Sequence, residues 1–252
     1  AWEAAITPQT KMIYLESPTN PGLDIIDIAM ISRVAKKHNI ILNVDNCFAT
    51  PIGQTPIDLG ADLVVHSATK WIDGQGRVLG GAVVGRKDLI HEIYLFCRST
   101  GPSMSPFNAW ILSKSLETLE VRMDRHCSNA LYLAEKLEGN SQINFVKYPF
   151  LTSHPQHSIA KAQMKNGGGI VCFELKGGLE AGRKFLNQIK MLSLTANLGD
   201  TRSIASHPAS TTHAKLSEAE RLAAGITPGL IRISVGLEHR DDILADIDQA
   251  LN

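Results

Sequence analysis

Residues 40–70 read IILNVDNCFATPIGQTPIDLGADLVVHSATK and contain two short apolar runs, 40–44 and 63–66, each followed at once by polar residues. Runs of this length suit buried strands. A helical spacing of apolar residues precedes the first run from about Asp27, and a third apolar run, 80–84, leads into a helical pattern near Lys87. Near-continuous apolar strands joined by helices are typical of parallel sheets. We therefore predict an α/β fold whose mostly parallel sheet is covered by helices on both faces.

The second half of the chain has a different organisation. Apolar residues recur every three or four positions from Leu112 to Leu137, and Gly139 ends the pattern, which predicts one long helix. Strands are expected at 143–146, 170–175 and 230–235, with helices between and after them. The Ser-, Thr-, His- and Gly-rich segment 197–227 is expected to be a surface loop with a short helix near Glu218. A helix of this length often links two domains, so we predict that residues 1–112 belong to a first domain. Residues 113–252 would form a smaller α+β domain that begins with the long helix.

Composition excludes several classes of protein. The 25 basic and 25 acidic residues cancel, so nothing favours nucleic acid or an anionic membrane, and no apolar run is long enough to span a bilayer. Four widely spaced cysteines suggest reduced thiols and a cytoplasmic location. The nine histidines form no metal-binding pattern, and we expect His154 and His157 to be solvated and no metal to be bound. We therefore expect the protein to bind a small molecule.

Candidate catalytic residues follow the first two apolar runs. Asp45 ends the first, and Ser67, Thr69 and Lys70 follow the second. The carboxyl ends of parallel strands face one crevice, so these side chains should meet there. Taken singly, Asp45 is more simply a residue that caps a turn, and lysines are common in turns. Together, they supply an acid for a pyridinium nitrogen, hydroxyls for a phosphate and a lysine for a Schiff base, which is what pyridoxal phosphate requires.

Nucleotide-binding alternatives are weaker. Residues 74–79 have Leu79 where a G-x-G-x-x-G fingerprint needs glycine, and there is no Gly-Lys-Ser/Thr phosphate loop. Arg232 lies in the alternating run 230–235. Its guanidinium would either pair with a structural carboxylate, which spacing alone favours, or bind the carboxylate of a substrate.

Six motifs resemble the Cys/Met-metabolism pyridoxal-phosphate enzymes and together extend over the whole chain: 16–21, 44–51, 60–70, 198–200, 207–210 and 229–238. The resemblance implies the aspartate-aminotransferase-like fold (fold type I), with residues 1–112 as the C-terminal part of the large pyridoxal-phosphate-binding domain. It implies that Lys70 carries the cofactor as a Schiff base and moves protons, that Asp45 pairs with the pyridine nitrogen, and that Ser67 and Thr69 hold the phosphate. It further implies Asn20 near the phenolic oxygen, Arg232 on the substrate α-carboxylate, and Asn197 at the position of the serine that contacts this carboxylate in many relatives.

Within that family, 197–202 and 209–213 look most like the O-succinylhomoserine sulfhydrylase branch. This implies a transferase of methionine biosynthesis that replaces the γ-substituent of an O-acylhomoserine with sulfide to give homocysteine. Cystathionine γ-synthase, methionine or cystathionine γ-lyase and O-acetylhomoserine sulfhydrylase are alternatives. Family members are usually cytoplasmic homotetramers built from dimers. They possess an N-terminal segment before the point where this chain starts, so we expect a C-terminal portion. A structural or oligomerisation fragment without activity is the non-enzymatic alternative.

Overall fold

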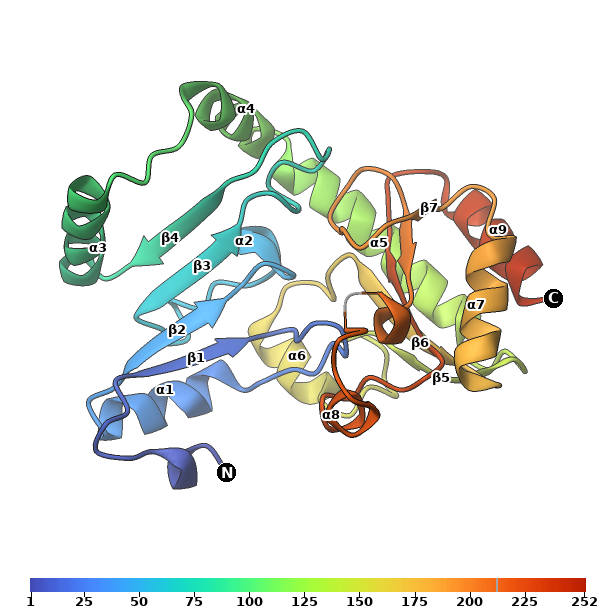
Figure 1. Ribbon diagram of the computed structural model, residues 1–252, viewed down its shortest axis with the longest axis horizontal. Helices are drawn as coiled ribbons and strands as arrows, with labels where there is room; N and C mark the ends of the chain where they lie inside the picture. The colour runs from blue at the N-terminus through green and yellow to red at the C-terminus, as the bar shows by residue number, and fades with distance from the viewer. Residues whose placement is uncertain (212) are drawn as a thin grey trace.

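The computed structural model describes residues 1–211 and 213–252, which form two sheets connected by three successive helices (Figure 1). The first sheet has the order β1-β2-β3-β4 and the second the order β5-β6-β9-β8-β7. A short 3-10 helix, Glu3–Ala5, precedes the first sheet. Thr212, which belongs to the predicted loop 197–227, lies outside the described residues.

The first sheet is mostly parallel, as predicted. β1 (Met12–Glu16), β2 (Ile41–Asp45) and β3 (Leu63–Ser67) are parallel, and β4 (Gly81–Gly85) runs antiparallel to β3. Helix α1 (Ile28–Lys37) begins after Asp27, whose carboxylate accepts a hydrogen bond from the Met30 amide at 2.8 Å. The short helix α2 (Thr50–Gly53) follows β2. The sequence pattern did not predict β1, the strand that borders β2.

The prediction that helices cover both faces of this sheet is wrong for its β4 side. All of β4 is exposed, and helix α3 (Lys87–Thr100) buries none of its residues. Figure 1 shows α3 beside β4 at the margin of the sheet and α4 beyond it, where Asn108 of α4 donates to the Leu79 carbonyl at 3.0 Å. Large apolar side chains are exposed along this region: Leu79, Val83, Val84, Tyr94, Phe96, Phe107 and Trp110. Among the described residues no further layer packs on them, and an apolar surface of this kind marks an interaction site.

The predicted long helix is two helices, α4 (Pro106–Leu116) and α5 (Leu119–Leu137). The backbone leaves the helical conformation at Thr118, whose φ is −114° and ψ is 4°. The Thr118 hydroxyl donates to the carbonyl of Ser115 at 3.2 Å, and the Arg122 guanidinium donates to the same carbonyl at 3.0 Å. Side chains therefore satisfy a carbonyl that a continuous helix would have paired internally.

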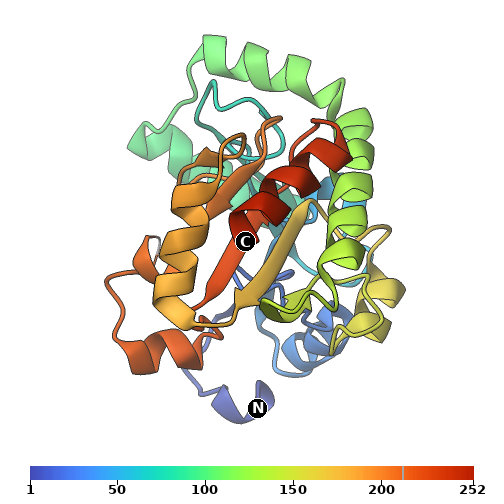
Figure 2. The ribbon, with the colours of Figure 1, turned by 90° about the vertical axis from the view of Figure 1, so that its right-hand side faces the viewer.

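The second sheet has helices on its outer face. Its strands are β5 (Ile143–Lys147), β6 (Ile170–Leu175), β9 (Leu230–Ser234), β8 (Ile204–Ser206) and β7 (Ser193–Leu194). Helices α5, α7 (Gly178–Gln188) and α9 (Arg240–Leu251) lie across it in Figure 2. Leu133, Phe173, Ile231 and Ile247 belong to the core between these layers. A separate buried cluster joins Trp71 and Phe48 to Met123 and Ile170, so the two sheets share a core.

Two expectations about exposure are also wrong. The segment 197–227 contains the short helix predicted near Glu218, α8 (Glu218–Ala223), but it also contains β8 and the 3-10 helix Pro208–Ser210, and residues 203–209 are buried rather than at the surface. His154, expected to be solvated, is buried just before helix α6 (His157–Gln163), and its Nε2 lies 3.1 Å from the Leu23 carbonyl oxygen. Backbone partners for the polar groups make this burial stable. Within residues 1–211 and 213–252, no helix combines the length and apolar character that crossing a bilayer demands.

The segment leading to Asn197 is fixed by one carboxylate. Asp246 on α9 accepts hydrogen bonds from the amides of Lys190, Met191 and Leu192 at 2.9–3.0 Å. We expect Asp246→Ala to lower the free energy of unfolding by about 1–3 kcal/mol, because three amides lose a charged acceptor. Denaturant titration measures this, with Asp248→Ala, an exposed aspartate of the same helix, as the control. Equal stabilities of the two variants would contradict the prediction.

Candidate active site

Asp45 ends β2 and uses both carboxylate oxygens. Oδ1 accepts a hydrogen bond from the Cys47 amide at 3.0 Å, and Oδ2 accepts one from the Tyr14 hydroxyl at 3.2 Å. The first contact is the turn-capping role that the sequence also allowed. The second shows that the other oxygen is directed to a donor beyond its own turn. Asp45 therefore lies at the edge of the sheet with an oxygen available to a polar partner.

The turn after β3 carries the predicted hydroxyls and the lysine. Ser67 is the last residue of β3, and the Thr69 hydroxyl exchanges hydrogen bonds with the carbonyl and amide of Gly80 at 3.2 and 3.1 Å. The amide of Thr69 also donates to the Gly80 carbonyl at 3.2 Å. Gly80, the residue directly before β4, thus orients the turn that contains Lys70.

Lys70 reaches across to the second sheet. Its Nζ donates to Oδ1 of Asn197 at 2.6 Å. Burial lowers the pKa of the Lys70 ammonium and nearby Arg232 lowers it further, against an opposing effect of Cys47. Gly199 has a φ of 77°, and a Cβ there would lie 2.7 Å from the Trp71 amide nitrogen, so only glycine lets this segment approach the lysine.

Arg232 lies in the middle of β9 and is 1% exposed. Nη1 donates to Oδ1 of Asn20 at 2.9 Å, and Nη2 donates to the carbonyls of Ala196 and Asn197 at 3.2 Å each. Its Nε is buried without a partner, and no carboxylate of the described residues lies within ion-pair distance. The structural ion pair that spacing favoured is therefore not found in the described chain. A buried cation with an unused N–H suits the carboxylate of a ligand.

Two residues of this site were missed from the sequence, Glu16 and Cys47. Glu16 ends β1 directly beside Asp45 in the strand register and accepts a hydrogen bond from the Asn20 amide at 2.9 Å. Burial raises the pKa of Glu16 to about 7, and Asp45 adds to the effect. Burial, with Asp45, also raises the pKa of the Cys47 thiol to about 12. Both residues lie in the family motifs that pointed to Asn20 and Asp45. Their position in these motifs is the sequence signal that could have identified them.

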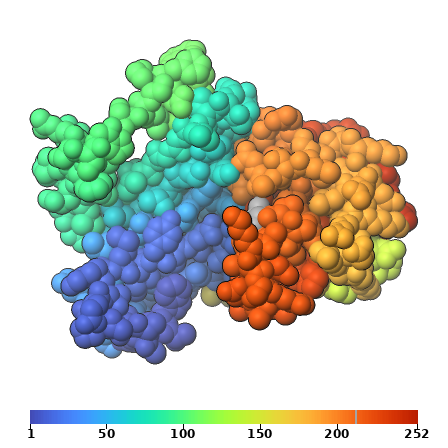
Figure 3. Space-filling model, viewed as in Figure 1, coloured from blue at the N-terminus to red at the C-terminus, as the bar shows by residue number. Residues whose placement is uncertain are grey.

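These contacts connect most of the predicted residues. A hydrogen-bonded path runs from Lys70 to Asn197, on to Arg232 and then to Asn20. Asp45, Ser67 and Thr69 lie on the adjoining strand ends and turn. On the face seen in Figure 3, the N-terminal part of the chain meets the segment that follows residue 200. An amine, a carboxylate, two hydroxyls and a buried guanidinium with an unused N–H are a donor set that fits pyridoxal phosphate and an amino-acid substrate.

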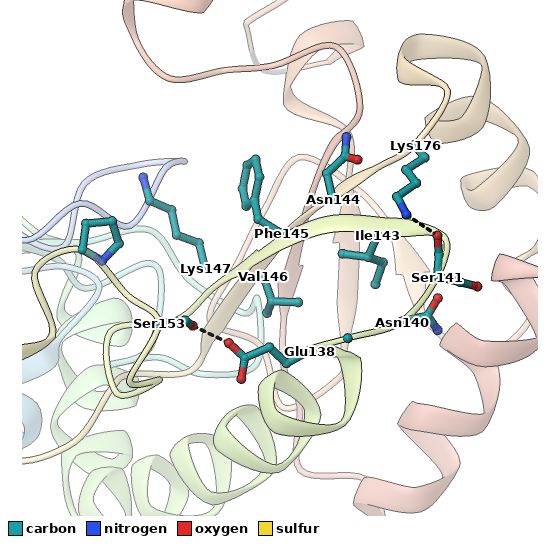
Figure 4. A pocket seen from close by; sticks show the side chains of 12 residues that line it. Glu138, Asn140, Ser141, Ile143, Asn144, Phe145, Val146, Lys147, Ser153 and Lys176 are labelled. Carbon is teal, nitrogen blue, oxygen red and sulfur yellow. Dashed lines mark hydrogen bonds between the residues drawn. The ribbon is translucent and has the colours of Figure 1, made fainter.

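A separate cavity lies away from these residues. It has a volume of about 660 Å³ and lies along β5, between Glu138, Phe145, Lys147 and Lys176 (Figure 4). Glu138 accepts a hydrogen bond from Ser153 there, and Lys176 donates to the Ser141 carbonyl at 2.6 Å. None of the predicted site residues lines it. In the part of the chain that the structure describes, no group of His, Cys, Asp and Glu has the arrangement of a metal site.

The raised pKa of Glu16 predicts a pH-dependent stability. A carboxyl group with a folded-state pKa of about 7 and an ordinary value of 4.5 binds more protons when folded, so its contribution declines as pH rises between these values. We expect Glu16→Gln to be more stable than the parent protein by about 1–3 kcal/mol at pH 7.5, with the difference shrinking toward pH 4.5. Denaturant titrations across this range measure it, with exposed Glu218→Gln as the control. A difference that does not change with pH would contradict it.

The family model of the Cys/Met metabolism PLP-dependent enzyme matches residues 1–252. The chain is 49% identical to O-succinylhomoserine sulfhydrylase of Pseudomonas aeruginosa and 49% identical to L-methionine gamma-lyase of Pseudomonas putida. Each alignment covers 100% of this chain, which spans 62% and 64% of the length of these curated relatives.

A solved structure agrees with the fold. The crystal structure of metB from Corynebacterium glutamicum superposes with a TM-score of 0.94 at 42% identity, covering 99% of this chain and 64% of that one. The predicted aspartate-aminotransferase-like α/β fold is thereby confirmed. The chain belongs to the Cys/Met metabolism PLP-dependent enzymes, a family whose cofactor is pyridoxal phosphate.

Proposed function

We propose that the protein containing this chain catalyses γ-replacement on an O-acylhomoserine, with O-succinylhomoserine favoured, and uses sulfide to form homocysteine. The observation that carries the proposal is the path from the Lys70 amine through Asn197 to the Arg232 guanidinium. The path joins the amine that we propose moves the proton to the guanidinium that we propose holds the α-carboxylate. The identity of 49% to an O-succinylhomoserine sulfhydrylase supports this choice of substrate.

Lys70 is the proposed catalytic base. Its amine must be neutral to take the α-proton of an amino acid, and burial, which lowers its pKa, raises the neutral fraction at neutral pH. Its hydrogen bond to Asn197 fixes the direction of the amine. Lys70 can therefore accept the proton at one position and return it at a neighbouring carbon without rearrangement of the backbone.

The remaining residues hold the reactants. Asp45 would hold the proton on the pyridine nitrogen, Ser67 and Thr69 would bind the phosphate, and Asn20 would lie near the phenolic oxygen. Bound pyridoxal phosphate supplies the electron sink that stores the charge left when the α-proton departs.

Arg232 and Asn197 would bind the substrate α-carboxylate. The guanidinium retains its buried Nε–H as a donor. Asn197 accepts from Lys70 through its amide oxygen, so its amide nitrogen is the donor left for the carboxylate. This arrangement would hold the α-carbon within reach of the lysine.

Elimination is the second candidate reaction. L-methionine gamma-lyase of Pseudomonas putida has the same 49% identity, and a cystathionine beta-lyase of Coxiella burnetii has 46%. The same base, acid and carboxylate site would serve either outcome. γ-Replacement and γ-elimination share the loss of the γ-substituent and differ in whether a thiol then adds, whereas a β-lyase expels its substituent from the β-carbon.

A substrate comparison tests the proposed reaction. The purified protein with pyridoxal phosphate is incubated with O-succinylhomoserine, O-acetylhomoserine or methionine, each with and without sulfide. We expect homocysteine to form fastest from O-succinylhomoserine and only with sulfide, since addition of the thiol completes the replacement. Faster release of an α-keto acid and methanethiol from methionine would instead identify a lyase.

Lys70→Ala is expected to reduce turnover by about 10²–10⁴-fold or more, because the base at the α-carbon is lost. In the parent protein, borohydride treatment after addition of pyridoxal phosphate should leave a pyridoxyl group on the peptide that contains Lys70, as mass spectrometry would show. Lys165→Ala, an exposed lysine outside the site, is the control. Undiminished multiple turnover by Lys70→Ala, or labelling at another lysine, would disprove the assignment.

A further inference from the structure

The guanidinium of Arg122 forms hydrogen bonds with the backbone of the two residues after Lys70. Arg122 lies on α5 and is 7% exposed. Its Nη1 donates to the Trp71 carbonyl at 2.7 Å, and its Nη2 donates to the Ile72 carbonyl at 3.0 Å. One planar fork thus binds the carbonyls of the two residues that follow the lysine.

The same side chain also fixes the break between α4 and α5. Nη2 donates to the Ser115 carbonyl at 3.0 Å, and Nε donates to the Thr118 hydroxyl at 3.2 Å. A single continuous helix would have engaged the Ser115 carbonyl internally. The break therefore supplies the guanidinium with two of its four partners, and it ties the start of α5 to the lysine turn.

Neighbouring residues leave room for this contact. Gly74 has a φ of 71°, and a Cβ there would lie 2.2 Å from Nη1 of Arg122. The amide of Gly74 donates to the Lys70 carbonyl at 2.8 Å, so the turn between them is closed on itself. One turn further along α5, the ring of His126 meets the Trp71 ring at 4.7 Å between centroids and 66°. Helix α5 thus contacts Trp71 through both its backbone and its side chain.

Packing alone does not account for an arginine here. No carboxylate of the described chain forms an ion pair with Arg122, because the nearby Asp73 pairs with Arg77 at 3.0 Å. Burial of a cation is costly, and apolar residues often replace buried charges without loss of stability. A planar guanidinium, however, aims two N–H groups at adjacent carbonyls, which lysine cannot do.

We propose that Arg122 is a positioning residue for Lys70. Arg122 holds the backbone of residues 71–72 so that the lysine amine stays beside Asn197. The inference rests on the proposed function for the role of Lys70. Arg122 lies outside the set of residues proposed to hold substrate and cofactor, and it acts only through the turn.

The test compares Arg122→Lys with Arg125→Lys. The first variant keeps the charge but loses the pair of coplanar N–H donors, and Arg125 is an exposed arginine of the same helix. The protein loaded with pyridoxal phosphate is assayed for kcat and KM, and its visible spectrum is titrated with pH. For Arg122→Lys we expect kcat per bound cofactor to fall by about 10–100-fold, as for a displaced catalytic group, with KM within about twofold. We also expect a shifted pH midpoint of the spectrum. Arg125→Lys should change none of these, and added guanidinium should restore part of the kcat of Arg122→Ala.

Unchanged kcat and spectral midpoint in a folded Arg122→Lys would overturn the inference. So would a lower Tm with an unchanged kcat per bound cofactor, since the contact would then serve stability only. Arg122→Ala, which removes the guanidinium, replaces Arg122→Lys if that variant does not fold, and should give the same shift. Unfolding of both variants would also overturn the inference. If no substrate is converted but the spectral midpoint still moves in Arg122→Lys, the positioning role stands and the proposed reaction fails.

Discussion

The parallel pairing of β1, β2 and β3 is the constraint on which the site depends. The register places Glu16 opposite Asp45, and Asp45 opposite Val65 two residues before Ser67. Side chains at paired positions of parallel strands point to the same face of the sheet. A shift of one residue in any of these strands would turn its polar end residue to the other face. Strand pairing therefore decides that an acid, a second carboxyl group and the lysine turn share one edge.

The second sheet supplies the opposite wall through its central strand. Arg232 is buried in β9, and hydrogen bonds to Asn20 and to the carbonyls of Ala196 and Asn197 offset part of the cost of burying its charge. The amide of Gly199 donates to the Ser234 hydroxyl at 2.9 Å, which attaches the Asn197 segment to the same strand. The position of Asn197, and hence of the Lys70 amine, follows from β9 rather than from the loop itself.

The sequence predicted those features of the fold that depend on residues close together in the chain. The apolar runs located β2 and β3, Asp27 marked the start of α1, and strand ends indicated Asp45 and Lys70 as neighbours. The break between α4 and α5 was not predictable, since its cause is a side chain that also binds Trp71 and Ile72, far away in sequence. The segment 197–227 has the composition of a loop, yet parts of it are buried because distant groups satisfy it. The His207 ring, for example, lies 2.7 Å from the Pro228 carbonyl oxygen, and Ser203 bonds to Glu238. Such partners belong to the tertiary structure and leave no periodic signal in the sequence.

The electrostatics of the assembled site bring two groups toward neutral pH from opposite directions. Burial, with Arg232, lowers the pKa of Lys70, while burial, with Asp45, raises the pKa of Glu16 to about 7. The effect of Cys47 on Lys70 opposes this only when the thiol is ionised, and a thiol pKa of about 12 keeps it protonated near neutral pH. Proton transfer is most efficient when the pKa of the base lies near the working pH. Burial thus makes Arg232 and Glu16 costly to the fold and also lowers the pKa of Lys70, the residue that we propose moves the proton.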